Sequence, residues 1–241
     1  MLAVDLICGQ HKIVAKYDGS YIFPLYLFST EIHVNDLLSE KEKPEAKFNF
    51  HPKLLKSLAE LLEQATDLDC VFQYIYAILY SNVYREKYTE FLRTGFPQIP
   101  FTSDRDLFHD LAALGKRLVD LHLLRSDELD PPIAKFNGSG EGKVQTGKNG
   151  LRYDPKTERV YINKSQYFEG VTSRVWEYQI GGYQVCHKWL KDRKDRRLSL
   201  DEIKTYCRIA TALSKTIEVQ EEIDKLYPAV EENLLVIKLD E

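Results

Sequence analysis

Hydrophobic positions repeat with the spacing of a helix in several stretches of the chain. One stretch begins after His51-Pro52, and Thr66 or Asp67 can cap a second, more apolar stretch that follows it. Gly95–Pro100 then ends the pattern, because its two prolines cannot sit inside a helix. The apolar positions of the first stretch fall on one helical face: Leu54, Leu55, Leu58, Leu61, Leu62 and Ala65.

A narrow leucine seam marks the next helix, which follows a weak capping signal at Ser103 and Asp106. Narrow seams favour packing along a partner helix. The last helix is the expected partner, since Ser199 and Glu202 form a capping box at its start; an intramolecular pair is favoured over a dimer. The seam positions are Leu107, Leu111, Leu114, Leu118 and Leu121, and those of the last helix are Ile203, Tyr206, Ala210, Leu213 and Ile217.

Alternating and β-branched positions predict a smaller β portion. Lys12–Tyr17 and Tyr21–Phe28 indicate a hairpin with Asp18-Gly19 as its turn. Arg152–Asn163 indicates two further strands with a turn at Asp154-Pro155, and Gly181-Gly182 precedes a helical run through Leu190. The expected fold class is α+β, mainly helical, with a small antiparallel portion in the N-terminal hairpin and around residues 143–180.

These patterns divide the chain into four parts. Residues 1–50 form an entry hairpin and a charged surface loop, and residues 51–130 a helical subdomain. Residues 131–198 form a basic, β-rich segment, and residues 199–241 a long helix expected to pack on the helical subdomain. No internal repeat interrupts this order.

Charge changes the picture, because the net charge of −4 is unevenly distributed over the 241 residues. From Ile133 to Arg197 the chain has 14 Lys and Arg against seven Asp and Glu, so this segment carries +7 and the remainder −11. A basic segment in an acidic chain indicates a polyanionic partner, or alternatively a solvated surface of mixed charge. Charge alone does not separate the two.

Several other classes have little support. With 44% hydrophobic residues the chain can bury a core, yet it has no apolar run long enough for a membrane span and no secretory signal. Four scattered cysteines and six unclustered histidines indicate neither a disulfide framework nor a metal site. Cys186-His187 are adjacent and point about 100° apart on a helix, which argues against a nucleophile–base pair. A cytoplasmic protein without catalysis of its own is expected.

Two short strings resemble loops of adenine-specific DNA methyltransferases. Asp130-Pro131-Pro132-Ile133 is similar to the loop that holds a flipped base, but it lacks the terminal aromatic that stacks on that base. Phe136–Gly140 is similar to the loop around the methyl donor, yet only a few residues separate the two strings. Such loops belong on different strands of a doubly wound sheet, so the spacing argues against a catalytic methyltransferase.

The basic segment interleaves side chains suited to DNA. Arg and Lys contact guanine and phosphates, Gln and Asn contact adenine, and Tyr contacts phosphates. Gly181 and Gly182 permit either a close backbone approach or a sharp turn. The competing interpretation is structural: Tyr161, Tyr167, Trp176 and Trp189 as core aromatics, with Gln179 and Gln184 closing a turn.

Three blocks resemble the C-terminal specificity region of Type ISP restriction–modification enzymes: Arg159–Val171, Val175–Val185 and Lys188–Arg193. Similar family patterns appear in Tyr74–Ser81 and Tyr84–Tyr88, and again in Phe96–Pro100 and Leu111–Gly115, so the likeness spans nearly the whole chain. It implies a target-recognition module of an enzyme whose nuclease, ATPase and adenine methyltransferase lie elsewhere.

The resemblance therefore favours sequence-specific binding of double-stranded DNA, with the methyltransferase domain of the same or a companion chain as a further partner. It places S-adenosylmethionine, ATP and Mg²⁺ on other domains and no cofactor here. The alternatives are an interaction module that docks other domains through its acidic part, and a remnant methyltransferase. The expected base or backbone contacts are Lys148, Arg152, Lys164, Gln166, Arg174, Gln179 and Tyr183, and the expected phosphate contacts are Lys191, Arg193, Lys194, Arg196 and Arg197.

Overall fold

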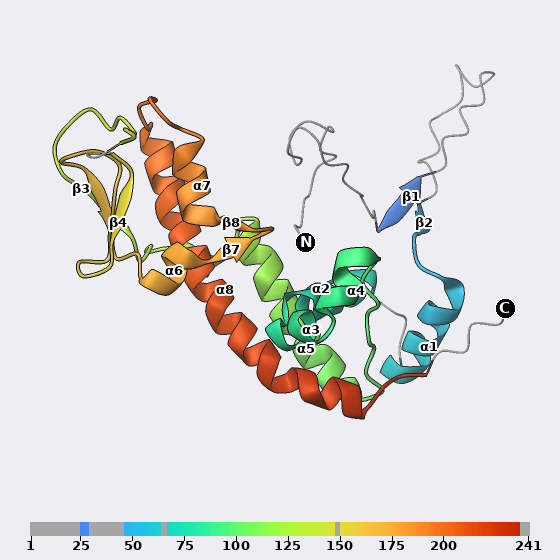
Figure 1. The fold of residues 1–241 in the computed structure, drawn as a ribbon. Coiled ribbons are helices and arrows are strands. Elements are labelled where there is room, and N and C mark those ends of the chain that lie inside the picture. The colour runs from blue at the N-terminus through green and yellow to red at the C-terminus, as the bar shows by residue number, and fades with distance from the viewer. Residues whose placement is uncertain (1–24, 29–45, 64–66, 148–149, 237–241) are drawn as a thin grey trace, which may run out of the picture. The chain divides into compact units, whose positions relative to one another are not determined.

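The computed structural model describes residues 25–28, 46–63, 67–147 and 150–236. It is mainly helical with one small four-stranded antiparallel sheet, which confirms the predicted α+β class. The chain divides into two compact units (Figure 1). The first comprises the described residues up to Lys116 together with those from Leu226 onward, and the second is Arg117–Lys225.

The described strand near the N-terminus is β1, Tyr26–Phe28, which pairs antiparallel with β2, Ala46–Phe48. The predicted strand Lys12–Tyr17 and the Asp18-Gly19 turn lie outside the described residues. The predicted surface loop at Ser39–Glu45 also lies outside them. The pairing of β1 with β2 was not expected from the sequence.

The first two helices of the first unit begin where the sequence predicts. His51 caps α1 (Pro52–Leu62) and Asp67 caps α2 (Leu68–Tyr80), each through a side-chain acceptor for a backbone N–H. Two short helices follow, α3 (Asn82–Lys87) and α4 (Thr89–Thr94), before the break at Gly95–Pro100.

Tyrosines fix that break to the helical core. The Tyr74 hydroxyl donates to the Pro100 carbonyl at 2.9 Å, and the Tyr84 hydroxyl donates to that of Gln98 at 2.9 Å. The Tyr74 ring stacks on Phe101 and Phe108 with centroids 5.3 and 4.6 Å away. The irregular connection is therefore part of the core.

Helix α5 (Arg105–His122) carries the predicted leucine seam, with Leu107, Leu111, Leu118 and Leu121 buried. Its expected cap at Ser103 is wrong. Asp104 accepts from the Leu107 N–H instead, and the Ser103 hydroxyl donates to the Asn233 carbonyl. Gly115 lets α5 approach α2 closely, since a Cβ at this position would lie only 1.8 Å from the Gln73 carbonyl oxygen.

The second unit holds the four-stranded sheet, in the order β3-β6-β5-β4. Its strands are β3 (Lys135–Asn137), β4 (Arg152–Asp154), β5 (Arg159–Tyr161) and β6 (Tyr167–Glu169). Between α5 and β3 lies the short helix η1, Asp127–Leu129. After the sheet come α6 (Ser173–Glu177), the hairpin strands β7 (Gln179–Ile180) and β8 (Tyr183–Gln184), and α7 (Val185–Lys191).

Helix α8 (Leu200–Glu232) begins at the predicted capping box. The Ser199 hydroxyl accepts from the Glu202 N–H at 3.1 Å, and the Glu202 carboxylate accepts from the Ser199 N–H at 3.0 Å. Its positions Tyr206, Ala210 and Leu213 pack in one core with the sheet, which differs from the expected pairing with the leucine seam. Within the second unit α8 does contact the end of α5, through Arg117–Glu222 and His122–Thr216.

Candidate nucleic-acid interface

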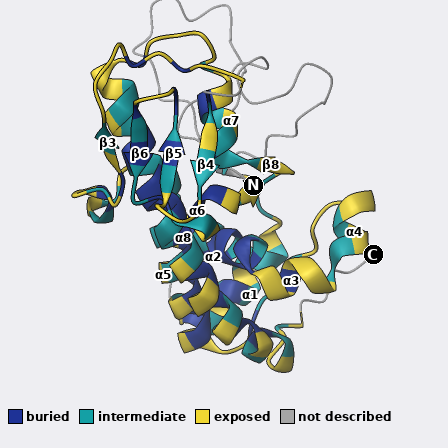
Figure 2. Cartoon of the chain, turned by 60° about the vertical axis from the view of Figure 1, so that its left-hand side comes forward, coloured by how far each residue is buried: buried dark blue, intermediate teal, exposed yellow. Residues whose placement is uncertain are grey.

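The central strands of the sheet, β5 and β6, alternate between buried positions and more exposed ones; Figure 2 colours the chain by burial. Tyr153, Val160, Phe168 and Phe136 lie side by side in the strand register, and Val160 and Phe168 are fully buried. The Phe168 ring lies 4.2 Å from that of Tyr206 on α8, so this face forms the core. Because side chains alternate along a strand, the neighbouring positions face away from α8.

The outer face of the sheet carries arginines stacked on tyrosines. The Arg152 guanidinium lies 3.9 Å from the centre of the Tyr161 ring, and that of Arg159 lies 4.4 Å from the centre of the Tyr167 ring. Arg159 also pairs with Glu169 at 3.0 Å. Tyr161 and Tyr167 are therefore half-buried outer-face residues, whereas Trp176 belongs to the core and Trp189 packs against it, as the structural interpretation expected.

Gln166 is buried, and its side chain is used inside the protein. Its Oε1 accepts from the Gly142 N–H at 2.8 Å and from Asn163 Nδ2 at 3.0 Å. Asn163 Nδ2 also donates to the Lys143 carbonyl at 3.0 Å, and its Oδ1 accepts from the Gln166 N–H at 2.8 Å. The expectation that Gln166 contacts DNA is therefore corrected: with 3% of its surface exposed, it holds the connection between β3 and β4 against the β5–β6 turn.

Seven cations lie on three segments that meet at one end of the sheet. Lys143 forms an isolated β-bridge with Arg197, and the Val144 N–H donates to the Arg196 carbonyl at 2.9 Å. Asn163, which binds the Lys143 carbonyl, precedes Lys164 in the turn between β5 and β6. We call this set the basic edge: Lys143, Lys164, Lys191, Arg193, Lys194, Arg196 and Arg197. Lys148, another predicted contact, lies outside the described residues.

Acidic side chains neutralise part of the basic edge. Arg193 and Arg196 both bind the Glu202 carboxylate, at 3.0 and 3.1 Å, and Arg197 binds Glu141 at 2.5 Å. The Ser199 N–H, with Arg193 and Arg196, holds the pKa of the Glu202 carboxyl below its usual value. Among the described ion pairs none involves the exposed Lys143, Lys164 or Lys191, so these three amines remain available to an anion.

A tight hairpin carries two more of the predicted contacts, Gln179 and Tyr183. Strands β7 and β8 are joined by Gly181 and Gly182, whose φ values of 58° and 80° make a turn between two strands; the turn does not lead directly into the helix. A Cβ at either glycine would meet nothing within 4 Å, so the tip is open to solvent. Gln179 is exposed, Tyr183 is 57% exposed, and the Lys188 amine lies 5.9 Å from the centre of the Tyr183 ring. We call residues 179–184 the glycine hairpin.

The predicted contacts do not form one continuous cluster. Near the glycine hairpin, Arg174 pairs with Glu221 at 2.5 Å and the Tyr178 hydroxyl donates to Gln220 at 3.1 Å. The basic edge instead binds Glu202, at the other end of the same helix within this unit. From Glu202 to Glu221 a straight helix rises about 28 Å at ~1.5 Å per residue. Arg174 and the basic edge thus contact α8 at separate points, so the predicted contacts do not share the single common groove that was expected.

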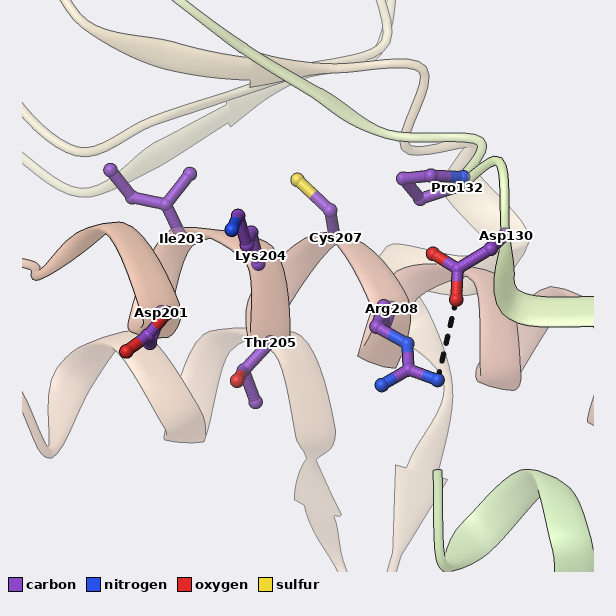
Figure 3. A pocket seen from close by; sticks show the side chains of 8 residues that line it. All are labelled: Asp130, Pro132, Asp201, Ile203, Lys204, Thr205, Cys207 and Arg208. Carbon is purple, nitrogen blue, oxygen red and sulfur yellow. Dashed lines mark ion pairs between the residues drawn. The ribbon is translucent and has the colours of Figure 1, made fainter. Parts of the chain in front are cut away.

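A pocket lies on α8 beside the turn that follows η1 (Figure 3). Arg208 pairs with Asp130 at 3.4 Å, and Lys204 and Asp201 add one charge of each sign. Burial raises the pKa of the Cys207 thiol to about 11, so the thiolate nucleophile is scarce at neutral pH. The eight lining residues are Asp130, Pro132, Asp201, Ile203, Lys204, Thr205, Cys207 and Arg208.

Other reactive groups in the described part of the chain are likewise held in inert settings. Burial raises the pKa of the Cys186 thiol to about 12, and the neighbouring His187 ring packs edge-on against Trp176. No three His, Cys, Asp or Glu side chains among the described residues are grouped to bind a metal. None of the helices the structure describes combines the length and apolar character of a membrane span.

The two strings that resemble methyltransferase loops have structural roles. Phe136 lies on β3, with its ring 4.9 Å from that of Phe168. Gly138, at φ 97°, passes so close to the β5–β6 turn that a Cβ would lie 2.1 Å from the Ser165 carbonyl oxygen. Asp130 pairs with Arg208. Gly138 therefore lets the connection after β3 pass close to the β5–β6 turn.

Comparisons with known proteins place the chain. A family model described as the Type ISP C-terminal specificity domain matches residues 1–222. A solved structure of the DrdV–DNA complex is similar with a TM-score of 0.59 and 21% identity, over 76% of this chain and 21% of that one. A solved structure of the Type ISP restriction-modification enzyme LlaBIII bound to DNA is similar with a TM-score of 0.58 and 18% identity, over 83% of this chain and 13% of that one.

This chain thus spans only a small part of either protein, and at these identities the likeness shows a shared fold. No curated protein matches significantly. The family match covers most of the chain, including the basic edge, the glycine hairpin and residues of both units. The chain therefore belongs to the family of Type ISP C-terminal specificity domains.

Proposed function

We propose that this chain binds double-stranded DNA as the target-recognition module of a restriction–modification enzyme. The observation that carries the proposal is the match of residues 1–222 to a specificity domain. The shared fold with parts of two proteins solved as DNA complexes supports it. Methyltransferase, nuclease and ATPase activities, with S-adenosylmethionine, ATP and Mg²⁺, then belong to parts of the enzyme outside this chain.

The two groups of side chains suit the two tasks of such a module. Phosphate contacts position a protein on DNA, and they use Lys, Arg and Tyr side chains. The exposed Lys143, Lys164 and Lys191 of the basic edge are suited to that task. Base edges are read by side chains such as Gln, and a two-stranded β-ribbon fits the major groove. The glycine hairpin offers Gln179 and Tyr183 on such a ribbon.

Arg152 and Arg174 belong to this surface in different ways. Arg152 is exposed at the edge strand β4, fixed over Tyr161 and close to the Asn163 carbonyl, with 3.5 Å between Nη1 and that oxygen. It therefore extends the basic edge onto the sheet. Arg174 is exposed but paired with Glu221, so it has to leave that carboxylate before it can bind a phosphate.

A second candidate is an interaction module of the same enzyme that does not contact DNA. Acidic partners already hold many cations of the basic segment, including Arg159, Arg174, Lys188, Arg193, Arg196 and Arg197. These ion pairs are the observation that favours the interaction module. The two candidates differ in one measurable property, which is the affinity of the chain for DNA.

Fluorescence anisotropy of a labelled duplex titrated with the chain tests the proposal. If about four phosphates are contacted, the affinity should fall about 100-fold between about 50 and 200 mM salt, because bound counterions are released. Single-stranded DNA of the same sequence is the control and should bind more weakly. No binding of the duplex at low salt would reject the DNA-binding function and leave the interaction module.

A further inference from the structure

We propose that Asn163 and Gln166 are positioning residues that assemble the basic edge into one binding surface for the sugar–phosphate backbone of DNA. This inference rests on the proposed function and deepens it. The ligand of the basic edge is the phosphate diester. The buried amide side chains of Asn163 and Gln166 set the geometry of that edge.

The first step concerns the three segments that carry the cations. They are the connection around Lys143, the turn around Lys164 and the connection from Lys191 to Arg197 between α7 and α8. None of them has regular secondary structure of its own at these lysines and arginines, apart from Lys191 at the end of α7 and the bridge between Lys143 and Arg197. Their relative placement therefore depends on the bonds between segments.

The second step is that the amide pair supplies those bonds. Asn163 Nδ2 donates to both the Lys143 carbonyl and Gln166 Oε1, at 3.0 Å each, and Gln166 Oε1 accepts from the Gly142 N–H at 2.8 Å. Gly142 in turn accepts from the Leu198 N–H at 2.9 Å, which brings the third segment to the same point. Both side chains are buried, with 7% and 3% exposed, so water does not compete for these bonds.

The third step is that the edge keeps cations free for an outside anion. The Glu141 carboxylate pairs with Arg197, and the Glu202 carboxylate pairs with both Arg193 and Arg196. Lys143 and Lys164 stand on the two segments that Asn163 links directly, and the described ion pairs include neither. The start of α8 is not the binding point, because Ser199 and Glu202 already cap it.

The experiment measures how the affinity of the chain for a random-sequence duplex depends on salt. Lys164→Ala and Lys143→Ala should each make the slope of log affinity against log salt shallower by about one, the effect of one lost phosphate contact. Lys156→Ala is the matched control. It removes the same charge from the exposed β4–β5 turn, outside the basic edge, and should leave the slope unchanged.

Gln166→Met and Asn163→Ser test the positioning role without changing charge. In either variant, folded as judged by circular dichroism, the slope should become shallower by about two, because two lysines lose their placement together. Adding Lys164→Ala to Gln166→Met should then have no further effect. A purely structural role predicts instead a lower melting temperature with the full effect of Lys164→Ala retained.

Two results would overturn the inference while the proposed function stands: wild-type binding with equal slopes for Lys164→Ala and Lys156→Ala, or a folded Gln166→Met or Asn163→Ser variant with the wild-type slope. If Gln166→Met does not fold, Asn163→Ser still answers the question, since a Ser hydroxyl can accept from the turn N–H groups. Failure of the wild-type chain to bind any duplex would instead reject the proposed function.

Discussion

Single acidic side chains determine how much of the positive charge on the basic edge is neutralised within the protein. Glu202 is the clearest case, because its carboxylate binds Arg193, Arg196 and the Ser199 N–H at once. Two guanidinium groups and a helix cap thus depend on one residue that is only partly exposed. In wild-type protein this carboxylate competes with any phosphate that approaches the two arginines.

Glu202→Gln should therefore raise the affinity for DNA. Glutamine keeps the capping bond to Ser199 but loses the negative charge, so Arg193 and Arg196 become available. We expect an increase of about twofold to fivefold, equivalent to ~0.4–1 kcal/mol, in anisotropy titrations at low salt. Glu218→Gln, which releases Lys215 on the same helix, is the control. Equal affinities of the two variants would contradict the prediction.

At the scale of helices and strands, polar side chains link α5 to α8 within the second unit. His122 on α5 and Thr216 on α8 lie 3.0 Å apart, between Nε2 and Oγ1. The Thr216 hydroxyl donates to the Ala212 carbonyl at 2.7 Å, so it accepts from His122, whose Nε2 must carry the proton. Burial lowers the pKa of the His122 ring to about 4.

The burial of the His122 ring makes stability depend on pH. The folded-state pKa lies below the ordinary value of about 6.5, so the unfolded state binds more protons between about pH 6.5 and 4. The free energy of unfolding should fall as pH drops through that window, by up to ~3 kcal/mol from this residue.

Urea denaturation of wild type and His122→Gln at several pH values measures the effect. The variant keeps an N–H donor toward Thr216 but does not titrate, so its stability should decline less steeply with falling pH. Thr216→Ser retains the hydroxyl and should follow the wild-type curve. Parallel curves for wild type and His122→Gln would show that the ring does not contribute.

At the scale of the whole molecule, the candidate contacts of the second unit are spread along α8. The basic edge binds Glu202 and Arg174 binds Glu221, and these two carboxylates stand on positions about 28 Å apart along the axis of α8. Such a span exceeds the distance of about 7–10 Å within which mutational effects commonly couple.

The losses of DNA-binding free energy in Lys164→Ala and Arg174→Ala should consequently add in the double variant to within about 0.5 kcal/mol. Anisotropy titrations of the two single variants and the double variant measure the sum. The pair Lys143→Ala and Lys164→Ala, both on the basic edge, is the comparison in which coupling is expected. Strong coupling between Lys164 and Arg174 would indicate one continuous contact surface instead.

The amino-acid sequence determined the features that depend on local periodicity and capping. The starts of α1, α2 and α8, the break at Gly95–Pro100 and the strand–turn–strand of β4 and β5 follow from neighbouring residues, and the structure has them as predicted. Residues 159–193, which carry the family resemblance, hold side chains of both the basic edge and the glycine hairpin.

Only the tertiary structure decided which of those side chains face outward. Gln166 and Lys164 stand two positions apart and both have polar side chains, yet Gln166 is buried among backbone groups and Lys164 is exposed. Likewise, Tyr161 lies on the outer face although its neighbour Val160 is in the core. The partners that settle these places, Gly142, Lys143 and Tyr206, are distant in sequence, and local patterns carry no information about contacts made by chain segments that meet only after folding.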